Sequence, residues 1–106
     1  MSIMPDNVDE RVYQKDDLEE VVKPPSLYHV ILLDDDYTEM EFVVFILQQV
    51  FNKSFDDACH IMLKIHNEGK AIAGTYSKEI AEMKAHKVKE IASESEFPLK
   101  AIIEKE

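Results

Sequence analysis

The 106-residue sequence contains one cysteine and no tryptophan. Because the lone Cys59 cannot form an internal disulfide, the chain fits a reducing compartment, and we expect a cytoplasmic protein. The sequence also lacks a Gly-rich phosphate loop and the His-Glu-x-x-His, Cys-x-x-Cys and nucleophile-elbow motifs. An enzyme therefore has weak support from the residues, and we expect no cofactor or metal.

Basic residues are scarce as well. Twelve Lys and Arg stand against 22 Asp and Glu, which gives a formal net charge of -10. Phosphate binding needs basic patches, so neither nucleic acid nor an anionic membrane is an expected partner, whereas cationic groups are natural complements. No apolar run approaches the roughly 20 residues of a spanning helix, and no signal peptide is visible at the start.

The residues that are present divide into two parts. Residues 1–25 hold seven acids against three bases, their apolar residues are scattered, and Pro24-Pro25 closes the segment. Such a segment buries too little surface to offset its ordering entropy, so we predict a flexible acidic extension. A short docked helix over Val8–Val22 is the alternative. Residues 26–106 then form one small core domain.

The core domain begins with a strand and a helix. Tyr28–Leu33 is rich in Val, Ile and Leu and predicts a strand. Thr38 and Glu41 have the spacing of a capping box, which predicts a helix that begins at Thr38. Apolar residues then recur at helical spacing at Met40, Val43, Val44, Leu47 and Val50. Because Phe42 and Phe45 occupy other faces, we expect this helix to be buried on several sides or to contribute to a binding groove.

The rest of the sequence predicts two more helices and two more strands. The second helix begins at Ser54 and ends at Gly69, where glycine can adopt the left-handed conformation. A third helix begins at Ser77, between strands over Ala71–Tyr76 and Leu99–Ile103. The order βααβαβ predicts an α+β fold, with a small three-stranded antiparallel sheet and three helices packed on one of its faces.

Three carboxylates, Asp34, Asp35 and Asp36, lie between the first strand and the first helix. Short charge runs are commonly solvated turns. Alternatively, the run is an acceptor cluster for an α-amino group, which is largely cationic at pH 7 and presents three N–H donors. Each charge-assisted hydrogen bond of this kind is worth about 1.5–3 kcal/mol. Both interpretations remain open from the residues alone.

His66 is the other candidate polar residue. In the simpler interpretation, it is a histidine near a helix C-terminus, where the helix dipole favours it. Because His66 follows Met62 and Ile65 by one turn or less, its imidazole would also lie at the edge of an apolar patch. A neutral imidazole there could accept a hydrogen bond from an amine. The neighbouring apolar residues belong to the core by default, although methionine often lines pockets for varied apolar groups.

These motifs together resemble the ClpS adaptor family. The resemblance is carried by Lys23–Val43, which includes the acidic loop, by His66–Ala71 and by Ile80–Lys84, and it extends over residues 23–106 in order. The family consists of bacterial N-end-rule adaptors that bind proteins beginning with Leu, Phe, Tyr or Trp. They deliver these proteins to a Clp AAA+ unfoldase, usually ClpA, for degradation by ClpP. The resemblance implies the α+β fold above with a mobile N-terminal extension.

The resemblance also implies a role for each matching position. The residues around the substrate α-amine would be Asp34, Asp35, Asp36 and His66. The pocket for the first side chain would be lined by Leu33, Thr38, Met40, Val43, Met62, Ile65 and Leu99. Met40 matches the family's gate against β-branched side chains. The contacts with the unfoldase's N-terminal domain would come from Glu79 and Lys84.

Two positions depart from the family pattern, which usually has Asn in place of Asp34 and Pro in place of Glu39. Asp34 keeps an acceptor for the amine but loses the amide donor and adds a negative charge, so we expect amine recognition to persist with a stronger salt dependence. Glu39 lies at the predicted helix start, where negative charge is favourable, and its effect should be small.

Two other functions are compatible with parts of the sequence. The first is an α+β interaction module that recruits factors through its helices and has no preference for free N-termini. The second is a metal-dependent enzyme that would use Asp34–Asp36 and His66, although three consecutive aspartates do not match a calcium loop.

Overall fold

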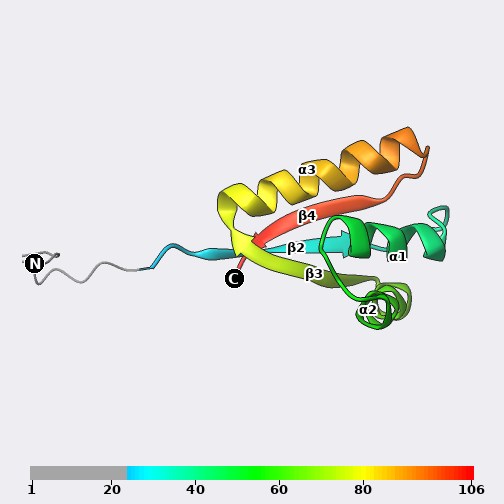
Figure 1. The fold of residues 1–106 in the computed structure, drawn as a ribbon, viewed down its shortest axis with the longest axis horizontal. Coiled ribbons are helices and arrows are strands. Elements are labelled where there is room, and N and C mark those ends of the chain that lie inside the picture. Colours follow the sequence, from blue (N-terminus) through cyan, green and yellow to red (C-terminus); the bar gives the residue numbers. More distant parts are fainter. Residues whose placement is uncertain (1–23) are drawn as a thin grey trace, which may run out of the picture.

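The computed structural model describes residues 24–106, and the predicted flexible extension over residues 1–25, like its helical alternative, falls almost wholly outside the described residues. The elements along the described chain are β2 (Leu27–Leu33), α1 (Met40–Gln49), α2 (Phe55–Glu68), β3 (Lys70–Ser77), α3 (Lys78–Glu94) and β4 (Lys100–Lys105) (Figure 1). This order confirms the predicted βααβαβ arrangement. Within residues 24–106, no helix combines the length and apolar character needed to cross a membrane.

The three strands form one antiparallel sheet with β2 in the centre, in the order β3-β2-β4. Ile31 lies opposite Ile72 of β3 and Ile102 of β4, and the register with β3 shifts between Val30 and Ile31. The last residue of β2, Leu33, pairs with Lys70, the first residue of β3. The loop that leaves β2 therefore starts beside the point where α2 ends and β3 begins.

The core lies on the face of the sheet that carries Val30 and Leu32, both fully buried. Alternate residues of a strand point to opposite faces, so Ile31 belongs to the other face. All three helices add buried side chains to the same core, namely Val43, Val44, Ile46 and Leu47 from α1, Ala58 and Ile65 from α2, and Ala81, Val88 and Ala92 from α3. The prediction of three helices on one face of the sheet is therefore confirmed.

Local capping signals fix the limits of α2 and α3. The hydroxyl of Ser54 accepts a hydrogen bond of 3.1 Å from the amide of Asp57, and Ser77 accepts one of 3.4 Å from the amide of Ile80. Gly69 ends α2 with φ 91°. These three signals are confirmed because a cap depends on residues within one turn of the helix end.

The predicted capping box at Thr38 and Glu41 is wrong. Helix α1 begins at Met40, its N-cap is Glu39, and no side chain caps it. The Thr38 hydroxyl instead donates a hydrogen bond of 2.8 Å to the carboxylate of Asp35. The Thr38 amide, which a capping box would pair with the Glu41 carboxylate, also donates to Asp35, at 2.7 Å. Asp35 therefore holds Thr38 in the loop, and the helix starts two residues later.

Candidate functional site

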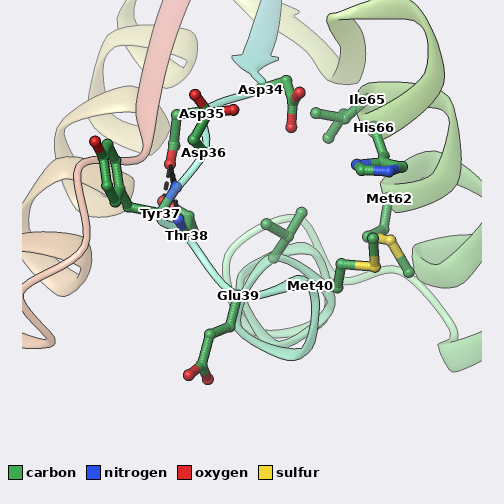
Figure 2. A pocket seen from close by; sticks show the side chains of 11 residues that line it. Asp34, Asp35, Asp36, Tyr37, Thr38, Glu39, Met40, Met62, Ile65 and His66 are labelled. Atoms are coloured by element: carbon green, nitrogen blue, oxygen red, sulfur yellow. Dashed lines mark hydrogen bonds between the residues drawn. The ribbon is translucent and has the colours of Figure 1, made fainter.

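A cavity of about 390 Å³ opens between the loop after β2, the start of α1 and the end of α2 (Figure 2). One part of its wall is acidic or polar and the other is apolar. The lining residues are Asp34, Asp35, Asp36, Tyr37, Thr38, Glu39, Met40, Val43, Met62, Ile65 and His66. The cavity thus brings the acidic loop and His66 together with four of the apolar residues predicted for a side-chain pocket.

Strand pairing brings Asp34 to the end of α2. Leu33 pairs with Lys70, and the next amide along the chain, that of Asp34, donates a hydrogen bond of 2.9 Å to the carbonyl oxygen of Gly69. His66 lies in the last turn of α2, just before Gly69. Figure 2 shows the Asp34 carboxylate and the His66 ring at adjoining sides of the same opening. Two acceptors that are distant in the sequence therefore face one space.

Asp35 differs from Asp34 and Asp36 because its carboxylate already accepts hydrogen bonds from neighbouring residues of the loop. It accepts hydrogen bonds from the amide of Tyr37 at 2.8 Å, from the amide of Thr38 at 2.7 Å and from the Thr38 hydroxyl at 2.8 Å. Burial raises the pKa of Asp35, but the hydrogen bonds from Thr38 and Tyr37 together outweigh it, so the pKa lies below its ordinary value. Asp35 stays ionised and fixes the shape of the loop.

Asp34 and Asp36 have exposed side chains, and within residues 24–106 neither carboxylate accepts a hydrogen bond from another residue. Their negative charges are thus available to a ligand. An amine ligand would find carboxylates on the loop and an imidazole on α2. The site fits a cation with several N–H donors better than an anion.

The apolar side of the cavity has a rigid part and a flexible part. Val43 and Ile65 are 7% and 2% exposed and belong to the core, so their positions are set by packing. Met40 is 44% exposed, and Met62 is half-buried. Figure 2 shows these two methionines on the same side of the cavity. Because methionine has three flexible torsions, this side can adapt to apolar groups of different shape.

Two residues predicted for the pocket do not line this cavity. Leu33 lines a separate hollow, together with Pro98 and Lys100 among others. Leu99 is 5% exposed and is part of the core. Conversely, Tyr37 and Glu39 line the opening but were not predicted as site residues. Figure 2 shows both side chains directed away from the cavity, so their position in the acidic loop was the only available signal.

Glu79 and Lys84, the predicted unfoldase contacts, lie on α3 and away from the cavity. The side chain of Glu79 is exposed. The Lys84 ammonium donates a hydrogen bond of 2.8 Å to the carbonyl oxygen of Val50 and lies 5.4 Å from the centroid of the Tyr76 ring. Exposed apolar side chains of α3, Ile80 and Met83, border the same hollow as Lys84. Lys84 therefore also ties α3 to the end of α1.

The metal-dependent alternative needs several ligands around one point. In the described part of the chain, no group of three or more His, Cys, Asp or Glu side chains is placed to hold a metal ion. The three aspartates of the loop diverge, because Asp35 turns back towards Thr38.

Known proteins are similar to this chain in both sequence and fold. The family model described as "ATP-dependent Clp protease adaptor protein ClpS" matches residues 23–102. A ClpS adapter protein of Wolinella succinogenes is 51% identical over 84 residues, which cover 79% of this chain and 82% of the relative. A ClpS adapter protein of Paraburkholderia xenovorans is 43% identical over 104 residues, 98% of both chains.

A solved structure is similar to most of the chain. The structure of Agrobacterium tumefaciens ClpS2 bound to L-phenylalaninamide superposes with a TM-score of 0.76 and is 40% identical in sequence. It covers 78% of this chain, and the match includes the whole of that protein. The similarity therefore extends over most of the chain.

Proposed function

The chain belongs to the ClpS family of Clp protease adaptors, and from this premise we propose that its cavity binds the first residue of substrate proteins that begin with Leu, Phe, Tyr or Trp. The adaptor then delivers these proteins to a Clp AAA+ unfoldase of the ClpA type for degradation by ClpP. Binding, rather than bond-breaking, is the activity of this chain. The proposal includes a cytoplasmic location, in keeping with the single Cys59.

One observation carries the proposal: a single cavity combines carboxylate and imidazole acceptors with an apolar wall. An N-terminal residue is the one part of a protein that presents a cationic α-amine and a side chain on the same carbon. Phenylalaninamide, the ligand of the Agrobacterium ClpS2 structure, carries both groups. An internal Phe lacks the free amine and would leave the acceptors unmatched, which is worse than losing one contact.

The acceptors are divided between direct binding and positioning. We assign direct binding of the α-amine to Asp34, Asp36 and His66. Asp35 contributes its charge and holds the loop, because its carboxylate oxygens already accept from Tyr37 and Thr38. The amine therefore meets an electronegative loop on one side and the imidazole on the other.

The apolar wall selects the first side chain. Met40, Val43, Met62 and Ile65 contact its body, and Thr38 lies at the border with the loop. Burying a Leu or Phe side chain there contributes about 1.5–3 kcal/mol. Met40, at the start of α1, is the proposed gate, since a side chain branched at Cβ would collide with it at the cavity mouth. Leu33 and Leu99 lie outside this lining, Leu33 at a separate hollow and Leu99 in the core.

Delivery uses a different surface. We assign the contact with the unfoldase's N-terminal domain to the exposed side of α3 around Glu79 and Lys84. Exposed Ile80 and Met83 add an apolar centre to this surface, with polar residues around it. Such a pattern suits a modest protein contact. Because α3 lies away from the cavity, substrate and unfoldase can be bound at the same time.

The test is fluorescence anisotropy with three labelled peptides that differ only at the N-terminus. One begins with Phe, the second is the same peptide N-acetylated, and the third begins with Val. We expect binding of the first alone. Equal binding of the first two, or binding of none, would contradict recognition of the α-amine.

A matched pair of variants on α2 links the binding to the cavity. His66→Ala removes an acceptor from the lining, whereas His60→Ala changes an exposed histidine of the same helix outside the lining. Loss of one charge-assisted hydrogen bond of about 1.5–3 kcal/mol predicts at least tenfold weaker binding for His66→Ala. His60→Ala should bind like the unaltered protein.

A further inference from the structure

A second hollow of about 450 Å³ lies between α1 and α2, next to the cavity. Helix α1 provides Met40, Glu41, Val44, Phe45 and Gln48, and α2 provides Phe55, Cys59 and Met62. Met40 and Met62 also line the cavity described above. The two spaces therefore share one wall, which is built from two methionine side chains.

The α1–α2 hollow gathers exposed apolar side chains. Phe45 is 46% exposed, Phe55 is 62% exposed and Met40 is 44% exposed. Single exposed apolar residues are normal on protein surfaces, but side chains from two helices that converge on one hollow indicate a contact surface. Among the described residues, Glu41 is the only charged one in its lining. The surface therefore suits an apolar side chain.

We propose that the α1–α2 hollow is a second subsite for the substrate, which takes an apolar side chain from residue 2, 3 or 4 of the same N-terminal segment. This inference rests on the proposed function, because the first residue must occupy the cavity. An extended chain advances about 3.3 Å per residue, so residues 2–4 lie within roughly 3–10 Å of the first along the chain. That distance is enough to pass a wall one side chain thick.

Charge and size favour the substrate over a second copy of the chain as the occupant. Two copies that each carry a net charge of -10 repel one another, whereas a substrate brings a cationic amine to the adjoining acidic loop. A stable dimer buries about 800 Å² on each partner, which exceeds what one small hollow between two helices offers. The substrate is also already held next to the hollow, so its second contact needs no separate encounter.

The experiment is a position scan with the full chain. A labelled peptide with Phe at position 1 and only Gly and Ser after it is compared by anisotropy with peptides that carry one Leu at position 2, 3 or 4. We expect at least one Leu position to strengthen binding by about fivefold, as partial burial of a Leu side chain implies. Unchanged binding for all three positions would overturn the inference while leaving the proposed function intact.

Two exposed apolar residues of α2 give a matched pair of variants. Phe55→Ser alters the hollow without touching the cavity lining, and Leu63→Ser removes a residue that is 46% exposed and lines neither space. We expect Phe55→Ser to abolish the gain from Leu and to leave the affinity of the Gly-Ser peptide unchanged. Leu63→Ser should keep both the gain from Leu and the affinity for the Gly-Ser peptide. A gain that survives Phe55→Ser would overturn the subsite. Failure of the Gly-Ser peptide to bind would instead overturn the proposed function and the subsite with it.

Discussion

The backbone amide of Asp34 donates a 2.9 Å hydrogen bond to the carbonyl oxygen of Gly69, which ends α2 in the left-handed conformation with φ 91°. This bond joins the loop that carries the three aspartates to the helix that carries His66. The proposed amine acceptors therefore depend on one glycine that is not itself a ligand.

Replacing this glycine should weaken both the fold and the site. A Cβ at position 69 would meet no atom within 4 Å, so the cost of Gly69→Ala comes from the backbone conformation alone. We expect a loss of about 1–2 kcal/mol in the free energy of unfolding and severalfold weaker binding of a Phe-starting peptide. Urea denaturation and anisotropy measure the two effects. Gly69→Asn is the control, since Asn tolerates this conformation better; equal results for Ala and Asn would contradict the argument.

The protein should lose stability when the Asp35 side chain is truncated. Asp35→Ala leaves the amides of Tyr37 and Thr38 and the Thr38 hydroxyl without their acceptor. We expect a loss of about 1–3 kcal/mol in the free energy of unfolding, measured by urea denaturation, together with weaker peptide binding. The control is Asp36→Ala, which removes an exposed carboxylate from the same loop and should change stability by less than about 0.5 kcal/mol. An equal loss in both variants would mean that charge, rather than hydrogen bonding, matters here.

The contribution of Asp35 to the free energy of unfolding should decrease as the pH falls. Its pKa in the folded protein is lowered from the ordinary 3.8, so the unfolded chain takes up a proton first as the pH falls. The stabilisation is therefore complete well above pH 3.8 and is lost as the pH drops through the folded-state pKa. We expect the stability difference between the unaltered protein and Asp35→Asn to be constant from pH 7 to about pH 5 and to shrink below about pH 4. Urea denaturation at each pH measures it, and a pH-independent difference would contradict the assignment.

The features of the fold that could be predicted from the sequence are those set by short-range interactions. Ser54, Gly69 and Ser77 act within one turn of a helix end, so their patterns could be recognised locally. Thr38 has an equally good local pattern, but Asp35 and Glu41 can both accept from its amide, and the sequence does not show which of the two prevails.

The candidate site was harder to predict, because its residues are brought together by long-range pairing and packing. Asp34 meets the end of α2 only because Leu33 pairs with Lys70, and this register is not visible in either segment. The resemblance to ClpS supplied that proximity; composition and spacing did not. The α1–α2 hollow was not predicted, because Phe45 and Phe55 lie on separate helices whose relative placement comes from packing.

Lys84 should affect stability as well as delivery. Lys84→Met removes the hydrogen bond to the carbonyl oxygen of Val50 and the contact with the Tyr76 ring. We expect a loss of about 1–2 kcal/mol in the free energy of unfolding, with unchanged affinity for a Phe-starting peptide. Lys87→Met is the control, because within residues 24–106 the Lys87 ammonium forms only an exposed 3.4 Å ion pair with Glu90 on the same helix, and such pairs contribute little. We also expect Lys84→Met to bind the unfoldase N-terminal domain more weakly. Glu79→Gln is the comparison for this measurement, because it changes the charge of the same surface without losing the contacts of Lys84.

The charge of Asp34 should give substrate binding a distinctive salt dependence. Asp34 is exposed beside Asp36, and its carboxylate adds a Coulomb attraction for the α-amine that dissolved ions screen. Asp34→Asn keeps an acceptor oxygen but loses the charge. Between low salt and about 0.5 M salt, we expect the affinity for a Phe-starting peptide to fall about fivefold further for the unaltered protein than for Asp34→Asn.

Anisotropy titrations at several salt concentrations measure the two slopes. Glu68→Gln is the control, because it removes one exposed charge from the same end of α2 but lies outside the cavity lining. Its slope should lie closer to that of the unaltered protein than the slope of Asp34→Asn does, since a charge farther from the amine contributes less Coulomb attraction. Parallel slopes for the unaltered protein and Asp34→Asn would show that position 34 acts through hydrogen bonding alone. Recognition of the amine would then depend on the geometry of the loop, which Asp35 and Gly69 hold, rather than on its excess of negative charge.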